Sequence, residues 1–95
     1  MRIAYLPSCR SDLRWFRHYY DRVFPEGAAS ARSRILATER LLLDNPHVGR
    51  PIHSQSVRRL SVPRTPFFFV YRVTAERIEI IRIVDSRSYD SMLLD

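Results

Sequence analysis

Arginine is the residue type whose chemistry is most informative in this sequence. All 16 basic residues are arginine, none is lysine, and they exceed the 10 acidic residues to give a net charge of +6. A guanidinium grips carboxylates and phosphates through a planar fork, whereas the absence of lysine excludes Schiff-base chemistry and a lysine general base. We therefore expect an acidic partner: an acidic protein segment, a nucleic acid, or a machine bound to nucleic acid.

Other residues that commonly act as acids, bases or metal ligands are scattered. General acid–base catalysis needs a titrating group held against the reacting atom, and we expect exposed side chains at His18, His47 and His53. The single cysteine, Cys9, cannot form an internal disulfide. It lies at the start of a predicted helix whose N-terminus could lower its pKa, but an inert thiol is the simpler interpretation. No Cys/His spacing fits zinc, and 2 glycines cannot form a nucleotide-binding loop, so we expect no metal and no cofactor.

The length of the chain limits its organisation and location. A sequence of 95 residues fits one domain, residues 1–95, and excludes a large multi-layer enzyme fold. No apolar stretch reaches the roughly 18 residues that a membrane span needs. The apolar run at the N-terminus is broken by Pro7 and is too short for a signal-peptide core. We expect a soluble, cytoplasmic protein.

Arginines in the C-terminal half could form a binding surface. A cluster of them on an open sheet face could bind phosphate or carboxylate, and the alternative is a solvated face with ion pairs. For Arg72 this alternative is specific, because a turn centred on residues 75–76 places it opposite Glu79. The same register places Arg82 opposite Phe69, where it would stack on the ring. A slip of one residue would change both pairings.

The elements that must position these residues follow from the hydrophobic periodicity. The pattern predicts a short strand, two helices, a proline-containing loop over 45–51, and three further strands. The predicted strands are 2–6, 57–62, 67–73 and 77–84, and the predicted helices are about 10–24 and 28–44. Grouped helices followed by grouped strands indicate an α+β fold: an N-terminal strand, an antiparallel helix hairpin on one sheet face, and a three-stranded antiparallel meander.

Three consecutive phenylalanines in one predicted strand divide between the two faces of the sheet. Phe69 and Tyr71 share a face and should pack under the helix hairpin. Their expected neighbours in the core are Leu13, Phe16, Ile35 and Leu42. Phe68 points the other way, and helices that cover only one face would leave apolar surface bare there. Bare apolar surface with an arginine rim is typical of a protein-binding site.

Several motifs, in this order, resemble the RelE/ParE toxins of type II toxin–antitoxin pairs. After the predicted helix hairpin, the segments that carry the resemblance are Asn45-Pro46-x-x-Gly49-Arg50-Pro51, Val57-Arg58-Arg59-Leu60, Phe69-Val70-Tyr71-Arg72-Val73 and Ile80 to Arg87. The resemblance covers nearly the whole chain. One departure is that many ParE-like members have histidine where Asp85 stands.

The resemblance also favours one branch of this superfamily. RelE-like members are ribosome-dependent mRNA endonucleases that use basic residues and a tyrosine on the open sheet face. ParE-like members lack that set and poison DNA gyrase by binding. Aligned on Val70-Tyr71, the RelE strand arginine falls on Phe68, which cannot stabilise charge developing on a phosphate. The RelE lysines have no counterpart. Arg87 and Tyr89 could stand for the C-terminal arginine and tyrosine of RelE, at shorter spacing. Two long helices and the Gly49–Pro51 loop favour ParE.

The resemblance implies a ParE-like toxin that inhibits DNA gyrase by binding and not by turnover. It also implies a cognate, ParD-like antitoxin in a hetero-oligomer with the toxin, with no membrane and no sequence-specific nucleic-acid contact. One alternative is a RelE-like ribosome-dependent mRNA endonuclease, and another is a toxin relic that retains only antitoxin binding. The candidate residues for binding target or antitoxin are Arg58, Arg59, Phe68, Arg72, Arg82, Arg87 and Tyr89.

Overall fold

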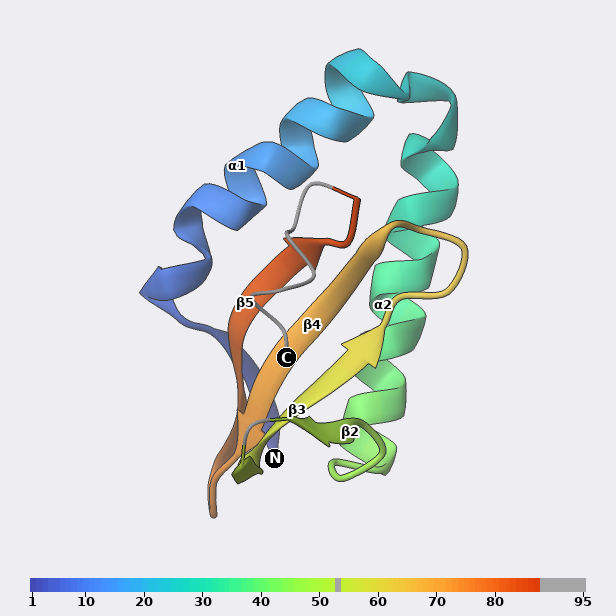
Figure 1. Cartoon of the computed structure of the whole chain (residues 1–95). Coiled ribbons are helices and arrows are strands. Elements are labelled where there is room, and N and C mark those ends of the chain that lie inside the picture. Colours follow the sequence, from blue (N-terminus) through green and yellow to red (C-terminus); the bar gives the residue numbers. More distant parts are fainter. Residues whose placement is uncertain (53, 88–95) are drawn as a thin grey trace.

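A computed structural model describes residues 1–52 and 54–87 of the chain (Figure 1). His53 and Tyr89, two residues of the sequence predictions, therefore lie outside the described residues. In chain order the helices and strands are β1 (Arg2–Tyr5), α1 (Arg10–His18), α2 (Ala28–Asp44), β2 (Arg50–Ile52), β3 (Ser54–Ser61), β4 (Phe67–Val73) and β5 (Arg77–Asp85). Short 3-10 turns at Pro7–Cys9 and Pro25–Gly27 precede the two α-helices. None of the described helices has the length and apolar character that crossing a membrane requires.

The strands form one mixed sheet in the order β1-β5-β4-β3-β2. The predicted antiparallel meander β3–β4–β5 is confirmed, and β1 joins its far edge parallel to β5. The sequence did not predict β2, because two prolines and a glycine in residues 45–51 are typical of a loop. Arg50–Ile52 nevertheless pairs with β3 and forms the other edge of the sheet.

Both helices pack on one face of the sheet, as predicted (Figure 1). The side chains of Phe69 and Tyr71 are fully buried in the core together with Leu42. Leu13, Phe16 and Ile35 are partly buried against the same cluster. The predicted core beneath the helix hairpin is therefore confirmed.

The first helix departs from the prediction in its last turn. After His18 the chain winds into a wider π-helical turn over Tyr19–Val23, and the Phe24 N–H donates to the Tyr19 carbonyl at 2.8 Å. The extra residue turns Tyr19 and Tyr20 toward the Phe67 ring, at centroid distances of 5.8 and 6.0 Å. Val23, which periodicity placed on the apolar stripe, is 55% exposed as a result.

A β-bulge changes the predicted register of the β4–β5 pair at residues 67–70 of β4. Arg72 faces Glu79 as predicted, but the pairing shifts between Tyr71 and Val70. Arg82 then faces Val70, so the predicted stacking of Arg82 on Phe69 is wrong. One additional residue in β5 accounts for the difference, since a bulge places two residues opposite one.

The start of α1 covers an edge of β5 that β1 leaves open. Because β1 ends at Tyr5, no described strand pairs with the backbone groups of β5 beyond Ile80 on that side. The Cys9 thiol donates to the Ile80 carbonyl at 3.0 Å, and the Asp12 carboxylate accepts the Ile83 N–H at 2.9 Å. Burial raises the pKa of the Cys9 thiol, and Asp12 raises it further. The pKa of this thiol is therefore raised on balance and not lowered, which fits the interpretation of Cys9 as an inert thiol.

Candidate protein-binding site

Arg58, the first of the predicted binding residues, holds the loop that precedes β2. Its Nη1 donates to the Gly49 carbonyl at 2.7 Å and to the His47 carbonyl at 3.1 Å. These two contacts from one nitrogen let Arg58 position the loop, while its guanidinium has no carboxylate partner among the described residues.

Arg72, Arg82 and Arg87 are each paired with a buried carboxylate of the same chain. Arg72 donates to Glu79 at 2.6 Å. Arg82 forms a bidentate ion pair with Asp12, in which Nε donates at 2.7 Å and Nη2 at 3.0 Å. The interpretation of these arginines as members of ion pairs, which the sequence had left open, is the one that the structure supports.

The Arg87 pair belongs to a larger network at the end of β5. Both Asp85 oxygens accept hydrogen bonds from Arg87, and the Trp15 indole donates to Oδ2 at 3.0 Å. Arg87 also donates to the Tyr19 hydroxyl at 2.9 Å and lies over that ring. Burial by itself would raise the pKa of Asp85, but these donors lower it on balance, while the Asp85 carboxylate raises the pKa of Arg87. The Arg87 side chain remains 52% exposed.

Arg59 and Phe68 meet on the sheet face opposite the helices. The Arg59 guanidinium lies 3.9 Å from the centroid of the Phe68 ring. Phe68 is only 1% exposed, so the prediction of a bare apolar surface at this residue is wrong. Arg59 has no carboxylate partner among the described residues, which distinguishes it from the three ion-paired arginines.

The described histidines form no catalytic grouping with these arginines. His18 stacks on Trp15 at a centroid distance of 5.6 Å, and His47 is exposed in the loop before β2. Among residues 1–52 and 54–87, no group of three or more His, Cys, Asp or Glu side chains could hold a metal ion.

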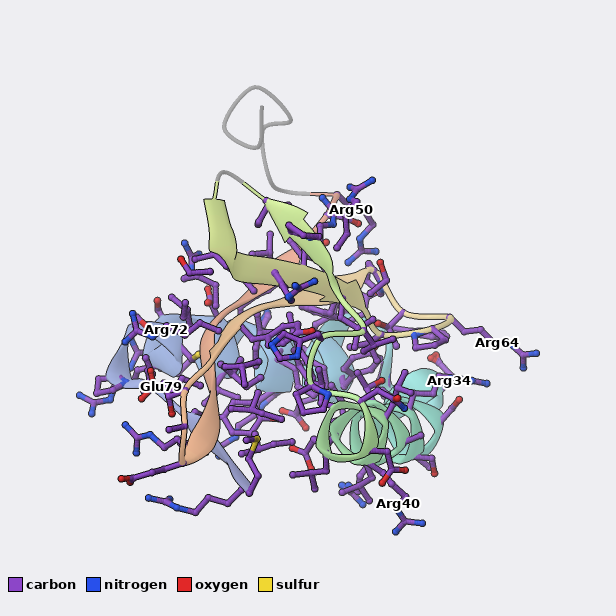
Figure 2. All side chains as sticks on the ribbon, turned by 90° about the horizontal axis from the view of Figure 1, so that it is seen from below. Arg34, Arg40, Arg50, Arg64, Arg72 and Glu79 are labelled. Atoms are coloured by element: carbon purple, nitrogen blue, oxygen red, sulfur yellow. The ribbon has the colours of Figure 1, made fainter. Side chains whose placement is uncertain are left out.

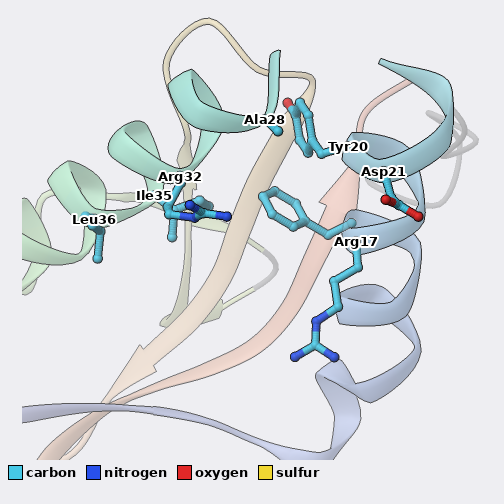
Figure 3. Close-up of a pocket in the computed structure, with 8 residues that line it drawn as sticks. Arg17, Tyr20, Asp21, Ala28, Arg32, Ile35 and Leu36 are labelled. Carbon is cyan, nitrogen blue, oxygen red and sulfur yellow. The ribbon is translucent and has the colours of Figure 1, made fainter. Parts of the chain in front are cut away.

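The structure has a cleft between the two helices that the sequence patterns did not predict. α1 and α2 meet at their connecting turn and diverge away from it (Figure 1), which leaves a cleft of about 640 Å³. The residues that line it are Phe16, Arg17, Tyr20, Asp21, Ala28, Arg32, Ile35 and Leu36 (Figure 3). We call this the helix cleft.

The helix cleft combines an apolar floor with positive charge on both walls. Arg17 on α1 and Arg32 on α2 lie on its two sides (Figure 3), and neither has a carboxylate partner among the described residues. The one acidic side chain in the lining, Asp21, is paired with Arg22 at 3.0 Å. Leu36 is 59% exposed on the α2 side. An apolar surface rimmed by unpaired guanidinium groups suits an amphipathic acidic segment of another protein.

Comparison with known proteins gives the family. Residues 3–88 match the family model of the ParE toxin of the type II toxin–antitoxin system parDE. The chain belongs to the ParE toxin family. A solved structure described as the chromosomal ParDE TA system from P. aeruginosa is similar, with a TM-score of 0.68 and 31% sequence identity. The similarity covers 90% of this chain and 95% of that chain. No curated protein gives a significant match.

The match to the ParE family begins within β1 and covers all later described helices and strands to the end of β5. It therefore includes both walls of the helix cleft and the ion pairs at Arg72, Arg82 and Arg87. Phe68, which the sequence resemblance aligned with the RelE strand arginine, is buried beneath Arg59. The sequence signal that could have located the cleft was Leu36, which widened the helical stripe beyond what one sheet face can cover.

Proposed function

We propose that this toxin inhibits DNA gyrase by binding, without turnover, and that a cognate antitoxin neutralises it in a hetero-oligomer. The observation that carries the antitoxin part is the helix cleft, where Arg17 and Arg32 lie beside an apolar floor without a carboxylate partner in the described part of the chain. The proposed gyrase target follows from the ParE family and from the lack of a RelE-like set among the described residues of the sheet. Gyrase inhibition also implies action in the cytoplasm.

The chemistry of the helix cleft favours an acidic amphipathic helix of the antitoxin. Apolar side chains on one face of such a helix would cover Tyr20, Ile35 and Leu36. Carboxylates flanking that face would reach Arg17 and Arg32, and guanidinium–carboxylate contacts are among the strongest hydrogen-bonded pairs in proteins. A nucleic-acid backbone would leave the apolar floor uncovered, so a protein segment is the better complement.

The internal pairing of the sheet arginines supports action without turnover. Cleavage of RNA requires donors aimed at the charge that develops on the phosphate. Phe68 offers no such donor, and the guanidinium groups of Arg72, Arg82 and Arg87 are aimed at carboxylates of the chain itself. The hydroxyl of Tyr71 is likewise engaged by backbone groups of the loop before β2.

Two assays on the purified toxin test this proposal together. In a gyrase supercoiling assay with trapping of cleavage complexes, we expect dose-dependent inhibition that addition of the antitoxin reverses. On ribosomes programmed with mRNA, we expect no site-specific cleavage. Cleavage above background that is lost in Arg87→Ala, with gyrase unaffected, would show that the RelE-like alternative is correct.

A further inference from the structure

Two arginines face each other across the edge of the sheet. Arg50 of β2 and Arg59 of β3 are direct partners in the antiparallel pairing and therefore share a face. Neither has a carboxylate partner among the described residues. Elsewhere on the same sheet, Arg72 lies opposite Glu79. Like charges placed directly opposite destabilise a strand pair, so an anion between Arg50 and Arg59 would relieve an unfavourable contact.

The backbone beside this arginine pair has an open edge. β2 begins at Arg50, whereas β3 continues past Arg59 to Ser61. The Val62 N–H bonds to the Phe67 carbonyl of β4. Because backbone groups alternate in direction along an antiparallel strand, the N–H and C=O of Ser61 point away from β4. No described strand lies there to receive them.

A cavity of about 400 Å³ lies at this open edge, with a lining of Val48, Gly49, Arg50, Arg59, Leu60 and Ser61. Val48 is 45% exposed and supplies an apolar wall. Figure 2 shows Arg50 on the side of the sheet away from α2, so the cavity is separate from the helix cleft. Arg59 is already held over the Phe68 ring, which reduces the conformational freedom that it would lose on binding.

We propose that the cavity at this open edge of β3 binds an extended acidic peptide segment. The segment pairs with Ser61 as an added strand and places a carboxylate between Arg50 and Arg59. The outward Ser61 backbone offers one donor and one acceptor, and a peptide strand satisfies both. A phosphate accepts hydrogen bonds but donates none, and it would also leave Val48 uncovered.

The test uses the whole, isotopically labelled protein and two synthetic peptides. The probe is acetyl-Thr-Val-Glu-Val-Glu-Val-Thr-amide, and the matched control has glutamine in place of both glutamates. We expect the probe to shift the NMR signals of the Ser61 amide and of the Arg50 and Arg59 Nε–H groups, and to slow exchange of the Ser61 amide. The control peptide should bind at least about tenfold more weakly, because it lacks the charged acceptors.

Variants separate the two parts of the proposed contact. Arg50→Gln with Arg59→Gln should remove the preference for the acidic peptide, and the matched pair Arg10→Gln with Arg14→Gln on α1 should keep it. Ser61→Pro removes the outward N–H and should weaken both peptides, whereas Ser61→Ala should not. The Arg50→Gln, Arg59→Gln protein should still unfold cooperatively near the melting temperature of the parent, because it loses the repulsion between the two arginines together with the contact of Arg59 with the Phe68 ring.

Three results would overturn the proposal. Equal binding of the two peptides would remove the arginines from the site. Shifts of Arg50 and Arg59 with a single-stranded oligonucleotide but with neither peptide would identify a nucleic-acid surface instead. No shift at Ser61 at millimolar peptide would exclude the added strand. None of these results depends on gyrase or on the helix cleft, so they test the peptide site independently of the proposed function.

Discussion

The backbone N–H of Gly49 donates to the phenolic oxygen of Tyr71 at 2.8 Å, and this hydroxyl donates in turn to the Pro46 carbonyl at 2.8 Å. A residue of the central strand thereby anchors the loop that leads into β2. The glycine is required by close approach and not by its backbone angles, since no glycine of the described chain has a positive φ. A Cβ at Gly49 would lie 2.6 Å from the Tyr71 hydroxyl and 2.8 Å from the Arg59 carbonyl.

Gly49→Ala should therefore destabilise the protein by roughly 1–3 kcal/mol, the usual cost of overpacking a filled site. The matched control is Gly27→Ala. There the three atoms nearest to a Cβ all belong to the Phe24 ring, the first at 2.3 Å, and that ring is a half-exposed side chain that can turn away. Urea denaturation of the two variants measures the difference. An equal loss of stability in both would show that the contact with Tyr71 is not the constraint.

Tyr71→Phe isolates the hydrogen bonds from the packing of the ring. The substitution keeps the buried ring but leaves the Gly49 N–H and the Pro46 carbonyl without their partner. An unsatisfied buried polar group costs roughly 1–3 kcal/mol. We expect a lower urea midpoint and faster hydrogen exchange at Gly49. Tyr20→Phe, which also removes a hydroxyl from a partly buried ring, should change neither measurement appreciably.

Acid should destabilise the sheet near the β4–β5 turn, because protonation of Glu79 removes its ion pairs with Arg72 and Arg77. Hydrogen bonds from Arg72 and then Arg77 lower the pKa of this carboxyl below its ordinary value. A carboxyl whose pKa is lowered by folding stabilises the native state above the unfolded pKa, about 4.3 for Glu, and the contribution is lost as pH falls through the folded pKa. The urea midpoint of the parent should exceed that of Glu79→Gln at neutral pH, and the two should converge below pH of about 4.

The control for this pH dependence is Glu76→Gln, on the adjoining turn. Glu76 is exposed and has no ion-pair partner among the described residues. Its urea midpoint should follow that of the parent at every pH. If Glu79→Gln and the parent remain equally separated down to pH 3, the ion pairs are not the cause of the difference.

Periodicity was sufficient for the elements whose side chains repeat regularly. The second helix was predicted as about 28–44 and is Ala28–Asp44, and the strand 67–73 is β4. The pairing of Arg72 with Glu79 also followed from the position of the turn. These features depend on neighbours in sequence, which the sequence itself displays.

The features that the sequence did not predict are irregularities in which one additional residue is stabilised by tertiary contacts. The π-turn at Tyr19–Val23 brings two tyrosines onto Phe67, and the β-bulge turns Arg82 toward Asp12. Neither irregularity has a periodic signal, because each is one additional residue stabilised by packing from a distant segment. The helix cleft was missed for a related reason, since the angle between α1 and α2 depends on how both lie on the sheet.

Charge reversal in the helix cleft tests the proposed contact with the antitoxin. Arg17→Glu with Arg32→Glu should weaken antitoxin binding by about tenfold or more, with most of the change in the association rate. For the parent toxin, the association rate should fall as salt rises, because charges beyond about 10 Å are screened at 0.1 M. Leu36→Ala should instead raise the dissociation rate, since apolar anchors determine residence time. Surface plasmon resonance at low and high salt measures all three.

The matched control has the same change in net charge at exposed arginines outside the cleft: Arg2→Glu with Arg64→Glu. If only long-range attraction to a +6 protein mattered, both double variants would slow association equally, and the cleft would have no special role. If the cleft is the contact, the Arg17, Arg32 variant should lose much more affinity than the control. It should also still inhibit gyrase, because the proposal assigns these two arginines to the antitoxin. A variant that had lost both activities and its cooperative unfolding would report misfolding, so a thermal melt of each protein belongs in the same experiment.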